Sequence, residues 1–279
     1  MNDFTAFYNE FLRQLELARK SNNSSDFQKL LKVVEPEWKL EEQELYVGYC
    51  IHKAGIYALF GESIDLDDWM QKALQFSDHE LLTDVYAKWI NLYWSLAKAV
   101  RDQSKITAIF SSLYNISTKA LKLEMGKFDR YSFISIRAFS LAALGKHSEL
   151  EEYLSSIKWN EIPVKLFNDK TKLGHLYTHL YKLLISALEI RDEKILNEIL
   201  KMVSIDDGII MSKSPLFRKF NTVVMDLSDL RPEFAADFNS FYKLRKKWAG
   251  YLPNFSLFTM MIEEENSKGL DLFFKGMEN

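Results

Sequence analysis

Residues 131–157, YSFISIRAFSLAALGKHSELEEYLSSI, predict two antiparallel helices joined by a tight turn at Leu144-Gly145-Lys146. Gly145 supplies the left-handed residue that ends the first helix, and Ser148 with Glu151 has the spacing of a capping box for the second. The first helix is apolar on two sides, which is typical of a helix that packs between neighbours. Its two stripes are Tyr131, Ile134, Ala138 and Leu141, and Phe133, Ile136, Phe139 and Ala143.

The second helix of this hairpin has one apolar stripe and an acidic outer face. Leu150, Tyr153, Leu154 and Ile157 form the stripe, and Glu149, Glu151 and Glu152 are expected to face water. A two-helix unit of this size cannot bury its apolar faces alone, so such units must stack.

Similar apolar quartets recur along the chain. Each quartet lies on a short predicted helix, and successive quartets start about 40 to 46 residues apart. Their first residues are Phe27, Leu66, Ile106, Leu150 and Leu196. The spacing predicts an all-α, α-solenoid-like stack of about five helical hairpins over residues 1–205, followed by a C-terminal helical cap over 206–279. The alternative is a non-repetitive helical bundle. The likeness to tetratricopeptide repeats is architectural only, because their period of about 34 residues and their Trp/Gly/Ala/Pro pattern are absent.

Composition favours the all-α class. The 279 residues are 47% hydrophobic and carry a formal net charge of -3, with only 10 Gly and 5 Pro against 20 Phe, 13 Tyr and 6 Trp. No alternating β pattern of useful length occurs. One cysteine, no signal-like N-terminus and no long apolar run predict a cytoplasmic protein. A pI near 6.0 gives no general attraction to nucleic acid or to membrane lipid, so neither is an expected partner.

Local signals predict where several other helices begin and end. Capping boxes are expected at Ser25 with Gln28 and at Ser77 with Glu80. A long helix is predicted from Glu37 to Phe60, with Gly61 as its C-terminal glycine.

Few residues are candidates for chemistry. His175 and His179 stand four apart on one predicted helix and could ligate a metal ion, but the glutamate of a metalloprotease helix is missing between them. Cys50 lacks the surroundings of a nucleophile and is interpreted as a small core residue. A carboxylate cluster, Asp65, Asp67 and Asp68, is interpreted as the cap and first turn of a helix. No cofactor is expected.

An aromatic string on one predicted helix is the candidate partner-binding site. Tyr86, Trp89, Tyr93 and Trp94 lie on two adjoining faces, so they either pack in the core or act as anchors on a protein-binding surface.

The order of features over residues 85–203 resembles the immunity protein 49 family of bacterial polymorphic toxin systems. An aromatic helix, WINLYWSLAKAV, is followed by Arg101-Asp102, a short helix and the central hairpin; LYKLLISALEIRDEKILNEIL later repeats an Arg-Asp turn between two helices. The resemblance implies an all-α, non-enzymatic protein that binds and neutralises a cognate toxin. Two alternatives remain: a peptide- or protein-sensing regulator or adaptor, and a metal-dependent helical enzyme using His175 and His179. The sequence does not indicate the oligomeric state.

Overall fold

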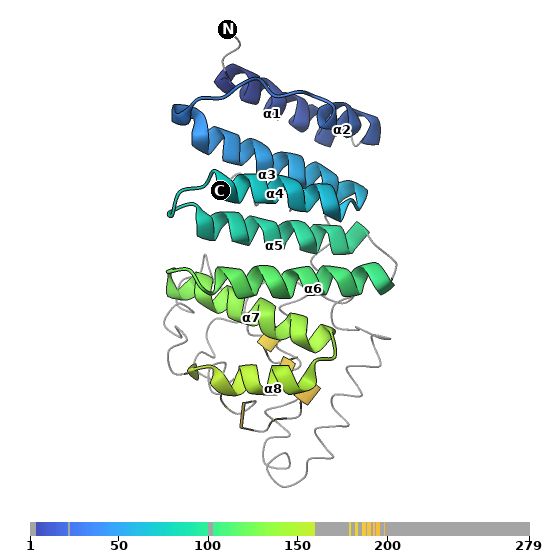
Figure 1. Cartoon of the computed structure of the whole chain (residues 1–279). Helices are drawn as coiled ribbons and strands as arrows, with labels where there is room; N and C mark the ends of the chain where they lie inside the picture. Colours follow the sequence, from blue (N-terminus) through green and yellow to red (C-terminus); the bar gives the residue numbers. More distant parts are fainter. Residues whose placement is uncertain are drawn as a thin grey trace, which may run out of the picture. The chain divides into compact units, whose positions relative to one another are not determined.

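A computed structural model describes residues 4–21, 23–99 and 103–159 and a few positions between 179 and 198 (Figure 1). Within these ranges the chain is helical and contains no strand, which confirms the all-α prediction. The elements are α1 (Phe4–Ser21), α2 (Ser24–Leu31), the 3-10 turn η1 (Leu40–Glu42), α3 (Gln43–Phe60), α4 (Ser63–Gln75), α5 (Leu82–Ala99), α6 (Gln103–Ala120), α7 (Lys127–Ala143) and α8 (His147–Ser156).

The described residues fall into two compact units. The boundary lies between Ile109 and Phe110, inside α6. The predicted boundary at residue 205 and the predicted C-terminal cap lie outside the described residues, and so does the quartet that begins at Leu196.

Helix α3 is the centre of the first unit. It contacts α1, α2, α4 and α5, and Figure 1 shows it between the α1/α2 pair and the helices α4 and α5. Tyr49 of α3 is completely buried among aromatic rings from α1 and α4; the closest centroids are those of Phe11 at 4.9 Å and Phe7 at 5.5 Å. Because aromatic pairs at these distances stabilise beyond their buried area, this ring cluster fixes α1 on α3.

A lysine of α3 is buried in the same unit. Lys53 is 1% exposed, and its Nζ donates to the carbonyl oxygens of Leu30 at 2.9 Å, Leu31 at 2.9 Å and Val33 at 3.1 Å. The last carbonyls of a helix have no partner within it, so the ammonium closes the end of α2 and ties it to α3. Burial lowers the pKa of Lys53 to about 8, which leaves the amine protonated at pH 7.

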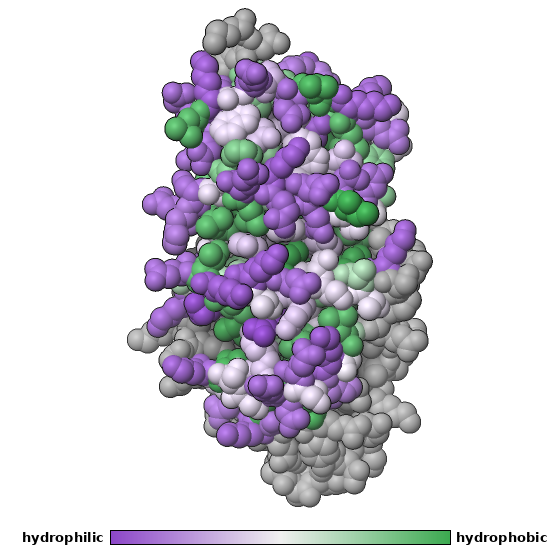
Figure 2. All heavy atoms as spheres, in the orientation of Figure 1, coloured by the Kyte–Doolittle hydropathy of each residue, from purple (hydrophilic) through white to green (hydrophobic). Residues whose placement is uncertain are grey.

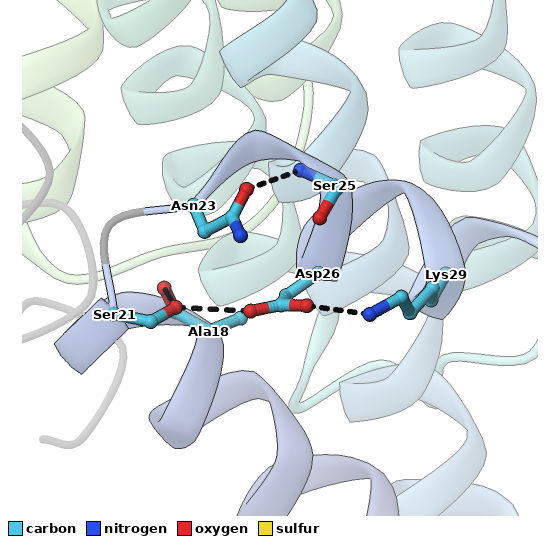
Figure 3. A network of polar contacts seen from close by, with 6 residues as sticks. All are labelled: Ala18, Ser21, Asn23, Ser25, Asp26 and Lys29. Carbon is cyan, nitrogen blue, oxygen red and sulfur yellow. Dashed lines mark hydrogen bonds and ion pairs between the residues drawn. The ribbon is translucent and has the colours of Figure 1, made fainter.

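The N-cap of helix α2 lies two residues before the predicted one. Asn23 is its N-cap, and the Asn23 side chain accepts a hydrogen bond from the backbone N–H of Ser25 at 3.0 Å. Asp26 then accepts from Ser21 and from Lys29, which holds the α1–α2 connection (Figure 3). The box predicted at Ser25 is therefore wrong, because an asparagine upstream is an equally good cap.

Two other predicted capping boxes are also wrong. Helix α5 begins at Leu82, and the Asp78 side chain accepts from the Leu81 N–H, whereas Ser77 donates back to the Ala73 carbonyl. Helix α8 begins at His147, and its N-cap Lys146 makes no side-chain capping bond. In both cases the backbone enters the helix at a different residue from the one that the spacing indicates.

The predicted end of α3 is confirmed, and its predicted start is wrong. Gly61 has φ of 77°, the left-handed conformation expected after the last helical residue. The helix starts at Gln43 rather than at Glu37. Residues 33–39 are not helical, and the 3-10 turn η1 precedes α3 directly.

The central hairpin 131–157 is confirmed as α7 and α8, with Gly145 at φ of 68°. Both predicted stripes of α7 are buried, except for the partly exposed Ile134, and Leu150 and Leu154 of α8 are buried opposite exposed Glu149, Glu151 and Glu152. The quartet at Leu66 is largely buried. The quartet at Phe27 fails at its last member, since α2 ends at Leu31 and Val34 is 84% exposed.

Candidate functional site

The aromatic string of α5 lies mostly in the interior. Trp89 is 3% exposed, Tyr93 1% and Trp94 8%, and only Tyr86 is partly exposed. Of the two roles left open by the sequence, burial favours core packing for Trp89, Tyr93 and Trp94. The physical reason is that α5 packs on both α3 and α4, which covers two of its faces.

The Asp67 side chain accepts hydrogen bonds from two of these aromatic residues. Trp89 Nε1 donates to Asp67 Oδ1 at 2.9 Å, and the Tyr93 hydroxyl donates to Asp67 Oδ2 at 2.7 Å. The carboxylate thus joins α4 to α5 through both oxygens. The predicted helix-start role holds for Asp65, which lies in the first turn of α4, and is wrong for Asp67.

His179 lies against α7 rather than in a described metal site. Its Nδ1 is 2.6 Å from the hydroxyl of buried Ser135, and its ring meets the ring of Tyr131 edge-on at 5.9 Å. His175 lies outside the described residues. Within the part of the chain that the structure describes, no three His, Cys, Asp or Glu side chains are grouped so that they could hold a metal ion.

Cys50 and His52 both belong to the packed centre of the first unit. Burial raises the pKa of the Cys50 thiol to about 12, as expected for a core cysteine. His52 Nδ1 lies 2.7 Å from the Gly48 carbonyl oxygen and 3.0 Å from the Tyr8 hydroxyl. A carbonyl can only accept, so Nδ1 carries the proton, and the Tyr8 oxygen shares it as a second acceptor. Burial lowers the pKa of His52.

A cation between aromatic rings is the strongest candidate site of the second unit. We call Tyr114 of α6, Arg137 of α7, Lys146 and Tyr153 of α8 the Arg137 cluster. The Arg137 guanidinium carbon lies 4.3 Å from the Tyr153 ring centroid and 5.5 Å from that of Tyr114. Lys146 Nζ lies 5.5 Å from the Tyr114 ring and forms an ion pair with Glu149 at 2.9 Å.

The Arg137 cluster contains polar atoms whose hydrogen-bonding capacity is not used. Arg137 Nε and the Tyr153 hydroxyl are both buried without a hydrogen-bond partner. Each such group costs on the order of 1–3 kcal/mol of stability. A buried polar group without a partner calls for a specific explanation, and a binding role is one of them.

The two arginines at this cluster have no carboxylate partner among the described residues. Within the described ranges neither Arg137 nor Arg130, two turns earlier on α7, forms an ion pair with a carboxylate. Burial raises the pKa of Tyr153, and the charges that oppose this rise are those of Arg137 and Arg130. Arg130 is exposed, and Tyr114, Arg137 and Tyr153 are partly exposed, so the cluster is accessible.

Sequence reasoning missed Arg137, although a signal was present. Arg137 is the only charged residue between Tyr131 and Gly145, in a helix whose other faces are apolar. A charged side chain in such a position either pairs with another group inside the fold or binds a partner molecule. The aromatic residues that flank Arg137 come from two other helices and are not close to it in sequence.

Exposed apolar side chains are scattered over the face of the described residues that Figure 2 shows. Figure 2 shows hydrophilic and hydrophobic side chains interspersed over one face. Among the described residues the large apolar side chains with the greatest exposure are Val34, Leu40 and Ile64. No helix in the described ranges is long and apolar enough to span a bilayer.

Comparisons with models of known protein families, with curated proteins and with solved structures found no match for this chain.

Proposed function

We propose that this chain is a non-enzymatic protein-binding protein, and that it acts as a bacterial immunity protein that binds and neutralises a cognate toxin in the cytoplasm. The observation that supports the proposal is the Arg137 cluster, where an unpaired guanidinium, partly exposed tyrosine rings and unused hydrogen-bonding groups occur together. Arginine and tyrosine are among the residues that contribute most to protein–protein binding energy.

The proposal includes a stack of helical hairpins as the scaffold of the binding surface. Successive hairpins that bury one another's apolar faces present a broad surface built from several helices, as in solenoid proteins. The hairpins α3/α4 and α7/α8, each with a glycine turn, support this arrangement. The resemblance of residues 85–203 to the immunity protein 49 family supports the choice of a toxin as the partner.

The test is co-expression with the protein encoded by the adjacent gene. We expect the chain to restore growth to cells in which that protein is toxic, and the purified pair to bind with a Kd in the nanomolar range or below. Toxicity that persists at equal expression, together with no complex at micromolar concentration, would contradict the proposal. A short peptide that raises the melting temperature when the neighbouring protein does not would instead indicate a peptide-sensing regulator.

A further inference from the structure

We propose that the Arg137 cluster, together with Arg130, is the docking site for an acidic segment of the partner protein, whose carboxylate pairs with the Arg137 guanidinium. This inference rests on the proposed function, since it names the chemistry by which a protein partner is recognised.

The geometry around Arg137 favours a planar, bidentate ligand. Rings from α6 and α8 lie against the guanidinium at 5.5 Å and 4.3 Å. Nε of Arg137 is buried, so a carboxylate would pair through its two oxygens with the two terminal Nη groups of the guanidinium. Lys146 already pairs with Glu149, so Arg137 is the cation of the cluster that lacks an acidic partner among the described residues.

The spacing of the two arginines favours an extended ligand with more than one carboxylate. Residues seven apart lie on the same face of a helix, about 10 Å apart along its axis. Arg130 and Arg137 therefore form a short basic strip on α7, and both charges act on Tyr153.

The small extent of the basic strip favours a protein carboxylate over a nucleic acid. Glu149, Glu151 and Glu152 are exposed on α8, so the positive charge is confined to the two arginines of α7. A polyphosphate backbone needs a continuous basic surface, which two arginines on one helix do not provide. A short acidic segment requires only the two arginines and the tyrosine rings.

The test uses the full chain and a fluorescein-labelled peptide of alternating glutamate and alanine, with the glutamine version as its control. We expect the glutamate peptide to bind and the glutamine peptide to bind at least about 10-fold more weakly. R137Q should weaken glutamate-peptide binding by about 10-fold or more, and R130Q, at an exposed position, by a smaller factor. K119Q, an exposed lysine of α6, is the matched control and should leave binding unchanged.

Two results would overturn the inference: equal binding of the two peptides, or R137Q and R130Q variants that bind the glutamate peptide as the wild type does. R137K keeps the positive charge but lacks the planar fork, so it should bind more weakly than wild type and more tightly than R137Q. Circular dichroism of each variant checks the fold, and R130Q keeps the test decisive if R137Q does not fold.

The same variants separate this inference from the proposed function. If the adjacent gene product binds the wild type and both arginine variants equally, the docking site is wrong and the toxin-binding proposal stands. If that protein does not bind but the glutamate peptide does, and R137Q abolishes the peptide binding, the docking site stands and the proposed partner is wrong.

Discussion

Substituting Gly48 by alanine tests how closely α1 approaches α3. An alanine Cβ at this position would lie 2.7 Å from the Tyr8 hydroxyl oxygen, about 0.7 Å inside an ordinary contact of roughly 3.4 Å. Tyr8 cannot easily move away, because it is buried and packs against the rings of Phe4, Tyr49 and His52.

Two opposing contributions set the magnitude. Overpacking of a well-packed core costs roughly 1–3 kcal/mol. Glycine to alanine in a helix interior gains about 1 kcal/mol from helix propensity. We therefore expect Gly48→Ala to destabilise the first unit by roughly 0–2 kcal/mol, whereas the same change at an open helical glycine would stabilise.

The decisive variant removes the atom that clashes. In Tyr8→Phe the nearest remaining atom is Cζ at 3.4 Å, an ordinary contact. Gly48→Ala in that background should stabilise by up to about 1 kcal/mol, so the sign of the effect reverses. The propensity term is present in both backgrounds and cancels, which leaves a coupling of roughly 1–3 kcal/mol in a double-mutant cycle.

The assay is urea denaturation followed by circular dichroism, with hydrogen exchange of peptides from α1 and α3 to localise the change. Exchange is included because the chain contains two compact units, and a single global transition cannot be assumed. If Gly48→Ala changes the free energy of unfolding by the same amount with Tyr8 and with phenylalanine at that position, the close approach is not what requires glycine.

Three further predictions concern the polar groups of the first unit, each measured by urea denaturation. Asp67→Ala should lower the free energy of unfolding by about 2–4 kcal/mol, because it removes the acceptor of two charge-assisted hydrogen bonds. The control is Asp68→Ala, at an exposed neighbouring position, which should stay within about 0.5 kcal/mol of wild type. Lys53→Met should cost about 1–3 kcal/mol and speed hydrogen exchange in α2, while Lys29→Met, which removes only an exposed ion pair in the same helix, should cost about 0.5 kcal/mol or less. Because burial lowers the pKa of His52, the unfolded chain takes up its proton first, so stability should fall as pH drops below about 6.5, and His52→Gln should reduce that fall.

The hairpin at 131–157 was predictable because its signals are local. A helical period on two faces, a glycine in the left-handed region and an acidic outer face depend only on neighbours along the chain, and each is confirmed in α7 and α8. Helix starts were less predictable, because Asn23 and Asp78 compete with nearby serines for the same backbone N–H groups. Spacing alone does not decide which side chain makes the bond.

The polar contacts between helices could not be predicted from the sequence. Asp67 has the appearance of a first-turn carboxylate, and only the packing of α5 on α4 brings Trp89 Nε1 and the Tyr93 hydroxyl to its two oxygens. The same aromatic residues had the composition of a binding surface. Their role was decided by which faces of α5 are covered, and that depends on tertiary structure.

The contrast between two cations of this chain is the physical basis for assigning a site. Lys53 is fully buried, and three backbone carbonyls of the same chain accept its hydrogen bonds, so its charge is accounted for within the fold. Arg137 has tyrosine rings beside it and no acceptor for its buried Nε. An unpaired buried donor is costly, and Arg130 two turns away has only the Leu123 carbonyl as an acceptor within the described ranges, so these two arginines are the basis of the proposed docking site. Lys53 therefore belongs to the architecture, and Arg137 is the position at which a partner is expected to bind.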